Sequence, residues 1–291
     1  MSEWMIGVLG GSGLYAIDAL ETAEWVSVES PWGQPSDDIL VGRVHGVRFA
    51  FLPRHGRGHR LPPADINARA NVDALKRLGC TDLLSVSAVG SLREDLQPGH
   101  FVIVDQFIDQ TRSRGTSFFG PGLVAHVSMA DPVCPRLSAF AAAAAKAAGA
   151  NVTQGSTYFA IDGPQLSTRA ESQLYHQSPC DVIGMTAMPE AKLAREAELP
   201  YALFGMVTDY DCWHEEEEPV QVSTVIAQLQ ANAATASKMV EALARVLPNE
   251  RTTCPLDTVL DHAIVTAPDA RDPAALEKLD AVAGRWLSTQ S

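Results

Sequence analysis

The chain has 291 residues, of which 46% are hydrophobic and 20% charged, a composition that excludes wholesale disorder. Its 22 Lys and Arg against 35 Asp and Glu give a formal net charge of −13, which argues against a nucleic-acid partner because such partners are bound through phosphate contacts. No apolar run is long enough to cross a membrane and no signal peptide is evident at residues 1–16, so we expect a soluble, cytoplasmic protein without a membrane partner.

The first half of the chain alternates apolar runs with helical patterns. The glycine at 79 and the glycine at 149 are typical helix stop signals. The residues after 86 (Ser87 to Ser91) are small and predict a turn at the end of a buried strand. We predict strands at 4–9, 38–44, 47–53, 82–86 and 101–107, and helices at 67–78 and 135–148.

The second half continues the same alternation, which predicts an α/β fold with a central mixed sheet flanked by helices. We predict strands at 155–161, 181–184 and 201–207, and helices at 169–176, 189–197 and along the amphipathic stretch from Val222 to Leu243. The chain shows no linker before Pro248. We therefore expect one domain at 1–248 and a C-terminal helical appendage at 249–291, whose last helix runs from about 272 to 287.

Two segments after predicted strands are suited to holding an anion. In GVLGGSGL (7–14) the glycine spacing is wrong for a dinucleotide fingerprint, but successive N–H groups and the Ser12 hydroxyl form a possible anion nest; a plain tight turn is the alternative. The stretch 54–60, RHGRGHR, is the densest cationic run of an acidic chain. We favour anion binding by Arg54 and His55 over a solvated loop or a zinc site, since arginine forms a planar fork that matches phosphate oxygens.

The strongest chemical signal is the pair Asp209 and Asp211, directly after a buried strand. In an extended segment residues two apart point the same way, so both carboxylates could meet one ligand edge. A carboxylate pair in a partly apolar pocket holds a proton on one member, which suits the 6-amino group and N7 of a purine. The alternative is a helix N-cap and a first-turn acid. Thr186, in a strand-to-helix turn, and Ser87 offer further hydroxyls, while Met185 is either a pocket wall or core.

The sequence resembles the trimeric purine nucleoside phosphorylase family, and within it the 5′-methylthioadenosine phosphorylases, from about residue 6 to residue 247. The resemblance is carried by GVLGGSGLY, SPWGQPSD, RHGRGHRLPPADINARAN, GSLREDLQPG, DQFIDQT, IDGPQLSTRAES, GMTAMPEAKLA and TDYDCW. It departs from the family at Gly184, where many relatives have Asn, and at Leu166, where an aromatic ring often stacks on the base. Beyond residue 247 the chain departs altogether.

The resemblance implies the roles of individual residues. It places Ser12, Arg54, His55, Ser87, Ala88 and Thr186 around phosphate, and Ala88, His126, Leu166, Met185, Asp209, Asp211, Val222, Val225 and Ile226 around the nucleoside. His126 would reach the 5′ end of the substrate from a neighbouring subunit, which implies a homotrimer with shared sites. Asp209, Asp211 and His55 would be the catalytic groups, with no metal and no organic cofactor.

The implied reaction is phosphorolysis of S-methyl-5′-thioadenosine to adenine and 5-methylthioribose 1-phosphate, a step of purine and methionine salvage with inorganic phosphate as co-substrate. Phosphate would attack the anomeric carbon opposite the base, while protonated Asp209 supplies a proton or hydrogen bond at N7. The alternatives are a broader phosphorylase acting on adenosine, inosine or methylthioinosine, a hydrolytic nucleosidase, and a non-catalytic nucleotide-binding protein. The acidic pair argues against 6-oxopurines, and the Arg54 site argues against water as the nucleophile.

Overall fold

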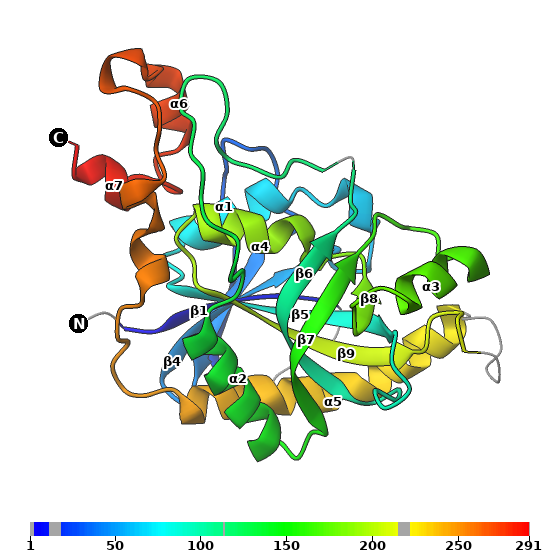
Figure 1. Cartoon of the computed structure of the whole chain (residues 1–291). Helices are drawn as coiled ribbons and strands as arrows, with labels where there is room; N and C mark the ends of the chain where they lie inside the picture. Colours follow the sequence, from blue (N-terminus) through cyan, green and yellow to red (C-terminus); the bar gives the residue numbers. More distant parts are fainter. Residues whose placement is uncertain (1–2, 12–18, 113, 215–221, 291) are drawn as a thin grey trace.

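The computed structural model describes residues 3–11, 19–112, 114–214 and 222–290, with the backbone alone at 222, 224 and 225 (Figure 1). Within these residues nine strands form a single mixed sheet. The strands are β1 (Met5–Gly10), β2 (Leu20–Val26), β3 (Ile39–Val44), β4 (Val47–Pro53), β5 (Asp82–Ser91), β6 (Phe101–Asp109), β7 (Val152–Ala160), β8 (Val182–Gly184) and β9 (Tyr201–Asp209).

The sheet has the order β2-β3-β4-β1-β5-β8-β7-β6-β9 and closes on itself through a further pairing of β5 with β9. Strands β4, β1, β5 and β9 run parallel to one another, while β8 is antiparallel to β5 and β6 is antiparallel to β9. The carboxyl ends of four neighbouring parallel strands therefore lie along one edge of the sheet, which is where α/β proteins bind ligands.

Helices cover both faces of the sheet, α1 and α4 on one and α2 and α5 on the other (Figure 1). Each pair of helices seals its own hydrophobic cluster against the strands. The helices are α1 (Ala68–Arg77), α2 (Pro135–Ala147), α3 (Arg169–His176), α4 (Ala187–Glu196), α5 (Val222–Val246), α6 (Pro273–Lys278) and α7 (Gly284–Ser288), with short 3₁₀ turns η1 (Pro63–Asp65), η2 (Pro255–His262) and η3 (Pro268–Ala270).

The C-terminal segment packs onto the cluster that α1 and α4 seal, to which it contributes buried Leu260, Leu279 and Trp286. The expected single helix over 272–287 is wrong. Asp272 does cap the first turn, but the helix ends after Lys278 and a separate short helix, α7, follows at Gly284–Ser288. Between the two helices the chain forms a turn whose residues Leu279, Val282 and Ala283 are buried.

The α/β class with a mixed sheet and flanking helices is confirmed, and two local predictions are wrong. Residues 87–91 are not a turn: β5 continues to Ser91, because Gly90 and Ser91 pair with β8 while Leu83 to Gly90 pair with β9. Strand β2 was not predicted, since all but its first and last residues are exposed and the sequence shows no apolar alternation there.

Candidate active site

The residues singled out in the sequence come together where strands end. Arg54 directly follows β4, Asp209 is the last residue of β9, and Ser87 lies in the second half of β5. Thr186 follows β8, whose last residues pair with the end of β5. Four separate stretches of sequence therefore contribute to one region at the carboxyl edge of the sheet.

Arg54 is buried, with 1% of its surface exposed, and its charge is compensated by Glu190 of α4. Its Nε and Nη2 atoms donate to the two Glu190 oxygens at 2.5 and 3.0 Å. Nη2 also donates to the Leu9 carbonyl and the Ser85 hydroxyl, and Nη1 donates to the Val86 carbonyl. Burial is the largest single influence and would lower the pKa of Arg54, but the charge and the hydrogen bond of Glu190, with smaller contributions from two tyrosines, together outweigh it and raise the pKa. The guanidinium stays charged, and its Nε–Nη2 edge is already hydrogen-bonded to Glu190.

The other edge of Arg54 is the part suited to a ligand. Nη1 carries two hydrogens, and among the described residues it has one acceptor, the Val86 carbonyl at 3.0 Å. One N–H of a rigidly held cation is thus left for an anion. The sequence suggested a fork directed at phosphate; the structure instead directs the Nε–Nη2 edge at Glu190.

His55 is half-buried and neutral at physiological pH. Burial is the main cause that lowers the pKa of His55 to about 4, and the positive charge of Arg54 lowers it further. Its Nδ1 lies 2.9 Å from the Leu61 carbonyl, so the neutral ring carries its hydrogen on Nδ1 and leaves a lone pair on Nε2. The His59 ring stacks on it at a centroid distance of 4.2 Å.

The later arginines of the cationic stretch lie in a solvated loop, as the alternative interpretation predicted. Arg57 is exposed and pairs with Asp37 and Asp38 at 2.7 and 3.1 Å. Arg60 is also exposed and donates to the Ser36 carbonyl. The stretch therefore divides into a buried beginning, Arg54 and His55, and an exposed remainder.

Ser87 and Thr186 present two hydroxyls side by side, with 2.7 Å between their oxygens. Both residues are buried. Thr186 occupies the N-cap position of α4, yet its side chain does not cap the helix. Its hydroxyl is instead directed to Ser87, so the turn predicted from the sequence supplies a polar group to the site and not to the helix.

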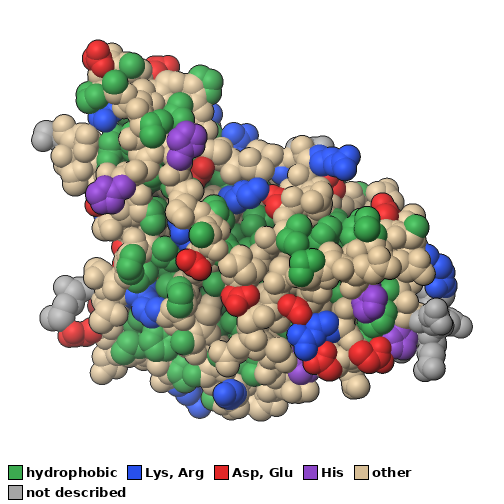
Figure 2. Space-filling view, in the orientation of Figure 1, with side chains coloured by type: hydrophobic (Ala, Val, Ile, Leu, Met, Phe, Trp, Pro, Cys, Tyr) green, Lys and Arg blue, Asp and Glu red, His purple; other side chains and the backbone are tan. Residues whose placement is uncertain are grey.

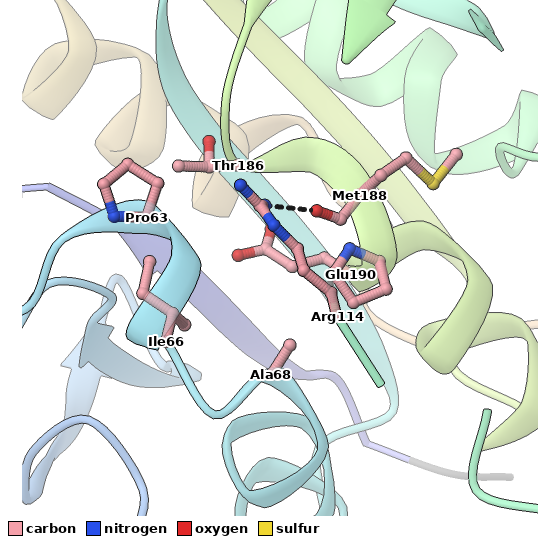
Figure 3. A pocket seen from close by; sticks show the side chains of 8 residues that line it. Pro63, Ile66, Ala68, Arg114, Thr186, Met188 and Glu190 are labelled. Carbon is pink, nitrogen blue, oxygen red and sulfur yellow. Dashed lines mark hydrogen bonds between the residues drawn. The ribbon is translucent and has the colours of Figure 1, made fainter. Parts of the chain in front are cut away.

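The turn that carries Met185 and Thr186 is clamped by Arg114. Arg114 Nη1 donates to the carbonyls of Met185 and Met188 at 2.6 and 2.7 Å, and Nη2 donates to the carbonyl of Asp162 at 2.8 Å. Figure 3 shows this guanidinium beside Thr186 and Glu190, at a small pocket that Pro63 and Ile66 close from the other side. Arg114 thereby fixes the 184–188 turn relative to the loop after β7.

Asp209 and Asp211 are linked to each other. The Asp211 N–H donates to Asp209 Oδ1 at 2.8 Å, and the Thr208 hydroxyl donates to Asp209 Oδ2 at 2.6 Å. The premise of a continuous extended segment is wrong: β9 ends at Asp209 and Asp211 has φ +53°, because the Asp209 carboxylate draws the backbone into an Asx-type turn. Residues 211–213 form a turn, and the helix that the N-cap alternative requires after them, at 215–218, lies outside the described residues.

Burial makes both carboxyl groups weaker acids. It is the main cause that raises the pKa of Asp209 and of Asp211, against opposing hydrogen bonds from Thr208 and Ser172. Asp211 Oδ2 is buried without a hydrogen-bond partner in the described part of the chain, an arrangement expected where a ligand supplies the missing bond. Gly90 packs closely against this turn, since a Cβ there would stand 3.0 Å from Asp209 Oδ1.

An apolar wall connects the two halves of the site. Met185 packs against Gly163, where a Cβ would lie 2.2 Å from its sulfur. Leu166 follows in the same loop and is 42% exposed, and the next residue, Ser167, accepts a bond from Cys212 Sγ. Ala88 lies between Ser87 and Gly90 on β5 and is half-buried. The loop after β7 therefore links Met185 to the turn that holds Asp211.

The contacts of the described residues do not bring the remaining expected residues into this cluster. His126 is exposed, and its N–H donates to the Ala263 carbonyl of the C-terminal segment. Ile226 lies in α5 and is 48% exposed. Ser12 and the side chains of Val222 and Val225 lie outside the described residues. The roles of these five residues stay predictions.

Other ligand classes find little support in the described residues. No three His, Cys, Asp or Glu side chains among them are grouped to hold a metal ion. In that same part of the chain no helix is long and apolar enough to span a membrane. Acidic and basic side chains are interspersed over the face drawn in Figure 2.

Sequence reasoning missed Glu190 and Arg114 as parts of the site. Glu190 was visible as an acid in the first turn of a predicted helix, where it reads as a favourable charge for the helix N-terminus. Arg114 gave no signal, because the carbonyls it binds come from residues 47 to 74 positions away.

Comparisons with known proteins agree with this geometry. The family model described as the Phosphorylase superfamily matches residues 5–245. A protein of Cereibacter sphaeroides named S-methyl-5′-thioadenosine phosphorylase is 60% identical, over 97% of this chain and 98% of its own; one of Geobacter sulfurreducens with the same name is 50% identical, over 98% and 100%.

Solved structures give the same result. A methylthioadenosine phosphorylase from an antarctic soil metagenomic library superposes with a TM-score of 0.91 at 46% identity, covering 97% of this chain and 99% of its own. The methylthioadenosine phosphorylase of Schistosoma mansoni in complex with adenine has a TM-score of 0.78 at 37% identity, with coverages of 84% and 91%. The resemblance drawn from the sequence motifs is confirmed, but the expectation that it ends at residue 247 is wrong, because three of these relatives match 97% or more of the chain.

Proposed function

The chain belongs to the Phosphorylase superfamily, and we propose that it cleaves S-methyl-5′-thioadenosine with inorganic phosphate, giving adenine and 5-methylthioribose 1-phosphate. The observation that carries the proposal is the placement of a buried cation and two hydroxyls at the same sheet edge as the half-buried carboxyl group of Asp209 and the buried one of Asp211. Ser87, Ala88 and Gly90 on β5 join the two halves. The broader alternative is not favoured, since relatives at 60% and 50% identity share the narrower name.

Phosphate is held by Arg54, Ser87 and Thr186 in this proposal, with Ala88 and Ser12 completing the ring as the sequence predicts. Arg54 contributes one N–H of Nη1, and its position is fixed by five acceptors. The hydroxyls are 2.7 Å apart, so one can donate to a phosphate oxygen while it accepts from the other.

His55 defines which form of phosphate binds. With Nδ1–H directed to the Leu61 carbonyl, neutral His55 offers an acceptor at Nε2. A hydrogen phosphate dianion carries the O–H that such an acceptor needs, and its remaining oxygens keep the negative charge. That charge faces the anomeric carbon, which becomes oxocarbenium-like as the base leaves, and stabilises it. No organic cofactor enters the proposed reaction.

The leaving adenine is protonated or hydrogen-bonded at N7 by Asp209. A carboxyl group whose pKa burial raises holds its proton more readily near neutral pH than an exposed one. Asp211, whose Oδ2 lacks a partner in the described region, accepts from the 6-amino group. Met185 and Leu166 supply apolar surface for the sugar and the base.

A homotrimer with shared sites completes the proposal. His126 is exposed in the single chain, on a segment held by the C-terminal residues through the Ala125–Ile264 bridge. A neighbouring subunit's His126 would meet the 5′ substituent. The C-terminal segment at 249–291, which we propose to be an appendage to the domain at 1–248, would then stabilise the segment that crosses between subunits.

Release of free base from methylthioadenosine, adenosine, methylthioinosine and inosine, measured with and without inorganic phosphate, tests the function. We expect turnover only with phosphate and the highest kcat/KM for methylthioadenosine. Thr186→Val should raise the KM for phosphate, whereas Arg57→Gln, which removes an exposed arginine of the same stretch, should not. Equal base release without phosphate would identify a hydrolase, and no release from any nucleoside would identify a binding protein.

A further inference from the structure

A buried tyrosine lies directly behind the two hydroxyls of the proposed phosphate site. Tyr158 belongs to β7, pairs with Val182 of β8 and has no exposed surface. The N–H of Thr186 donates to its phenolic oxygen at 3.3 Å. The hydroxyl of the same Thr186 shares the 2.7 Å hydrogen bond with Ser87. Neither the sequence motifs nor the proposed reaction gives this residue a role.

The absence of a side chain at Gly184 leaves the space that the Tyr158 phenol occupies. A Cβ built at Gly184 would stand 2.1 Å from the Tyr158 hydroxyl oxygen and 2.7 Å from Cζ, far inside van der Waals contact. Gly184 does not have a left-handed φ, so its glycine is required by space and not by backbone conformation. The glycine at a position where many relatives have Asn is thus explained: the phenol fills the volume of the missing side chain.

The bond from the Thr186 N–H fixes the backbone that carries the Thr186 hydroxyl. Because this N–H is buried and donates to the phenolic oxygen, removal of that oxygen leaves a buried donor without its acceptor, at a cost in free energy. The Thr186 hydroxyl in turn shares the 2.7 Å bond with Ser87, so a shift of the turn would displace both hydroxyls.

We propose that Tyr158 is a positioning residue for phosphate. In the space left at Gly184, its phenolic oxygen holds the Thr186 N–H, and it thereby keeps the hydroxyls of Thr186 and Ser87 in place for the anion. This role rests on the proposed function, because it presupposes that these two hydroxyls bind phosphate. It assigns Tyr158 no contact with either substrate.

Tyr158→Phe tests the proposal, since it removes the phenolic oxygen and keeps the ring. Loss of one orienting hydrogen bond should raise the KM for phosphate by roughly five- to tenfold, while the KM for methylthioadenosine at saturating phosphate changes by less than about twofold. Tyr175→Phe is the matched control. The ring of Tyr175, in α3, packs on Phe159 of β7, and this variant should keep the wild-type KM for phosphate.

A double variant shows whether Tyr158 acts through Thr186. In a Thr186→Val background, Tyr158→Phe should produce no further increase in the KM for phosphate. Thermal melting of each variant reports folding separately. A lowered Tm with an unchanged KM for phosphate, or equal increases in the KM values of both substrates, would reduce Tyr158 to a purely structural residue.

Gly184→Ala provides a second, independent test. The new methyl group would collide with the phenol, so the KM for phosphate should rise, and replacing the ring in the double variant Gly184→Ala/Tyr158→Leu should lessen the loss of Tm caused by Gly184→Ala alone. If wild-type turnover does not depend on phosphate, the proposed function and the positioning role both fall. If it does, and Tyr158→Phe leaves the KM for phosphate unchanged, the positioning role alone is wrong.

Discussion

Removal of the Glu190 carboxylate should leave the buried Arg54 without its counter-charge. The resulting loss of stability can be worked out from the contacts of Arg54. The two side chains are 2% and 3% exposed, so water cannot replace either partner. Breaking a buried ion pair from one side costs about 3–5 kcal/mol, because the remaining charge is left uncompensated. We expect this loss in Glu190→Ala.

The individual bonds indicate how the loss is distributed. Nε has Glu190 Oε1 as its acceptor at 2.5 Å, whereas Nη2 keeps the Leu9 carbonyl and the Ser85 hydroxyl at 3.0 and 2.6 Å. Glu190→Ala therefore orphans the Nε–H of Arg54, worth about 1–3 kcal/mol, and it also removes an acceptor of the Ser85 and Tyr201 hydroxyls. The lost charge accounts for the rest. Glu190→Gln retains an acceptor for Nε and should lose less stability than Glu190→Ala.

Thermal melting and phosphate kinetics measure both consequences. At about 2 °C per kcal/mol for a chain of this size, the apparent Tm of Glu190→Ala should fall by roughly 6–10 °C, and the KM for phosphate should rise because Arg54 is no longer fixed. The double variant Arg54→Met/Glu190→Met should melt above Glu190→Ala, since no unpaired charge remains. A Glu190→Ala protein that melts within about 2 °C of wild type, or a double variant that melts below it, would refute the reasoning.

Three further outcomes follow from the titratable groups. Asp209→Asn should lower the ratio of kcat/KM for adenosine over inosine at least tenfold or so, because an amide can donate to O6; an unchanged ratio would remove Asp209 from the purine edge. Since burial raises the pKa of Asp209, kcat/KM for methylthioadenosine should fall as the pH rises through that pKa, and a profile whose alkaline limb persists in Asp209→Asn would contradict the assignment. Burial lowers the pKa of His55 from 6.5 to about 4, so between these pH values the unfolded state binds more protons than the folded state. The free energy of unfolding should therefore fall as the pH drops from 6.5 to 4, by up to about 3 kcal/mol. Urea unfolding at both pH values measures this fall, and His55→Gln is the control that should lack it.

The fold was predictable where apolar periodicity decides it. Strand β4 and helix α3 begin and end at the predicted residues, because β4 is an apolar run and α3 carries a capping box at Thr168. Strand β2 was not predicted because its interior residues face solvent. The end of β5 was predicted as a turn because small residues are typical of turns. Only the hydrogen-bonded pairing with β8 and β9 holds these residues in a strand.

The site was predictable as a set of residue types and not as a set of contacts. The motifs identified the family and the order of the groups along the chain. They could not show that Arg54 is paired with Glu190, or that Arg114 clamps the turn at Met185, because both interactions join segments more than 70 residues apart. Nor could they show why Gly184 is a glycine, since the reason is a phenol on another strand.

The compensation of Arg54 also bears on how the proposed reaction would proceed. A dianion beside an unpaired guanidinium would have part of its negative charge drawn toward the cation, away from the sugar. Here Glu190 holds two of the guanidinium nitrogens, and the pKa of His55, lowered to about 4 by burial and by Arg54, keeps that ring neutral. The phosphate is then positioned by hydrogen bonds and by a cation whose charge is already balanced. Its own charge remains available at the face that meets the anomeric carbon, where the transition state develops positive charge.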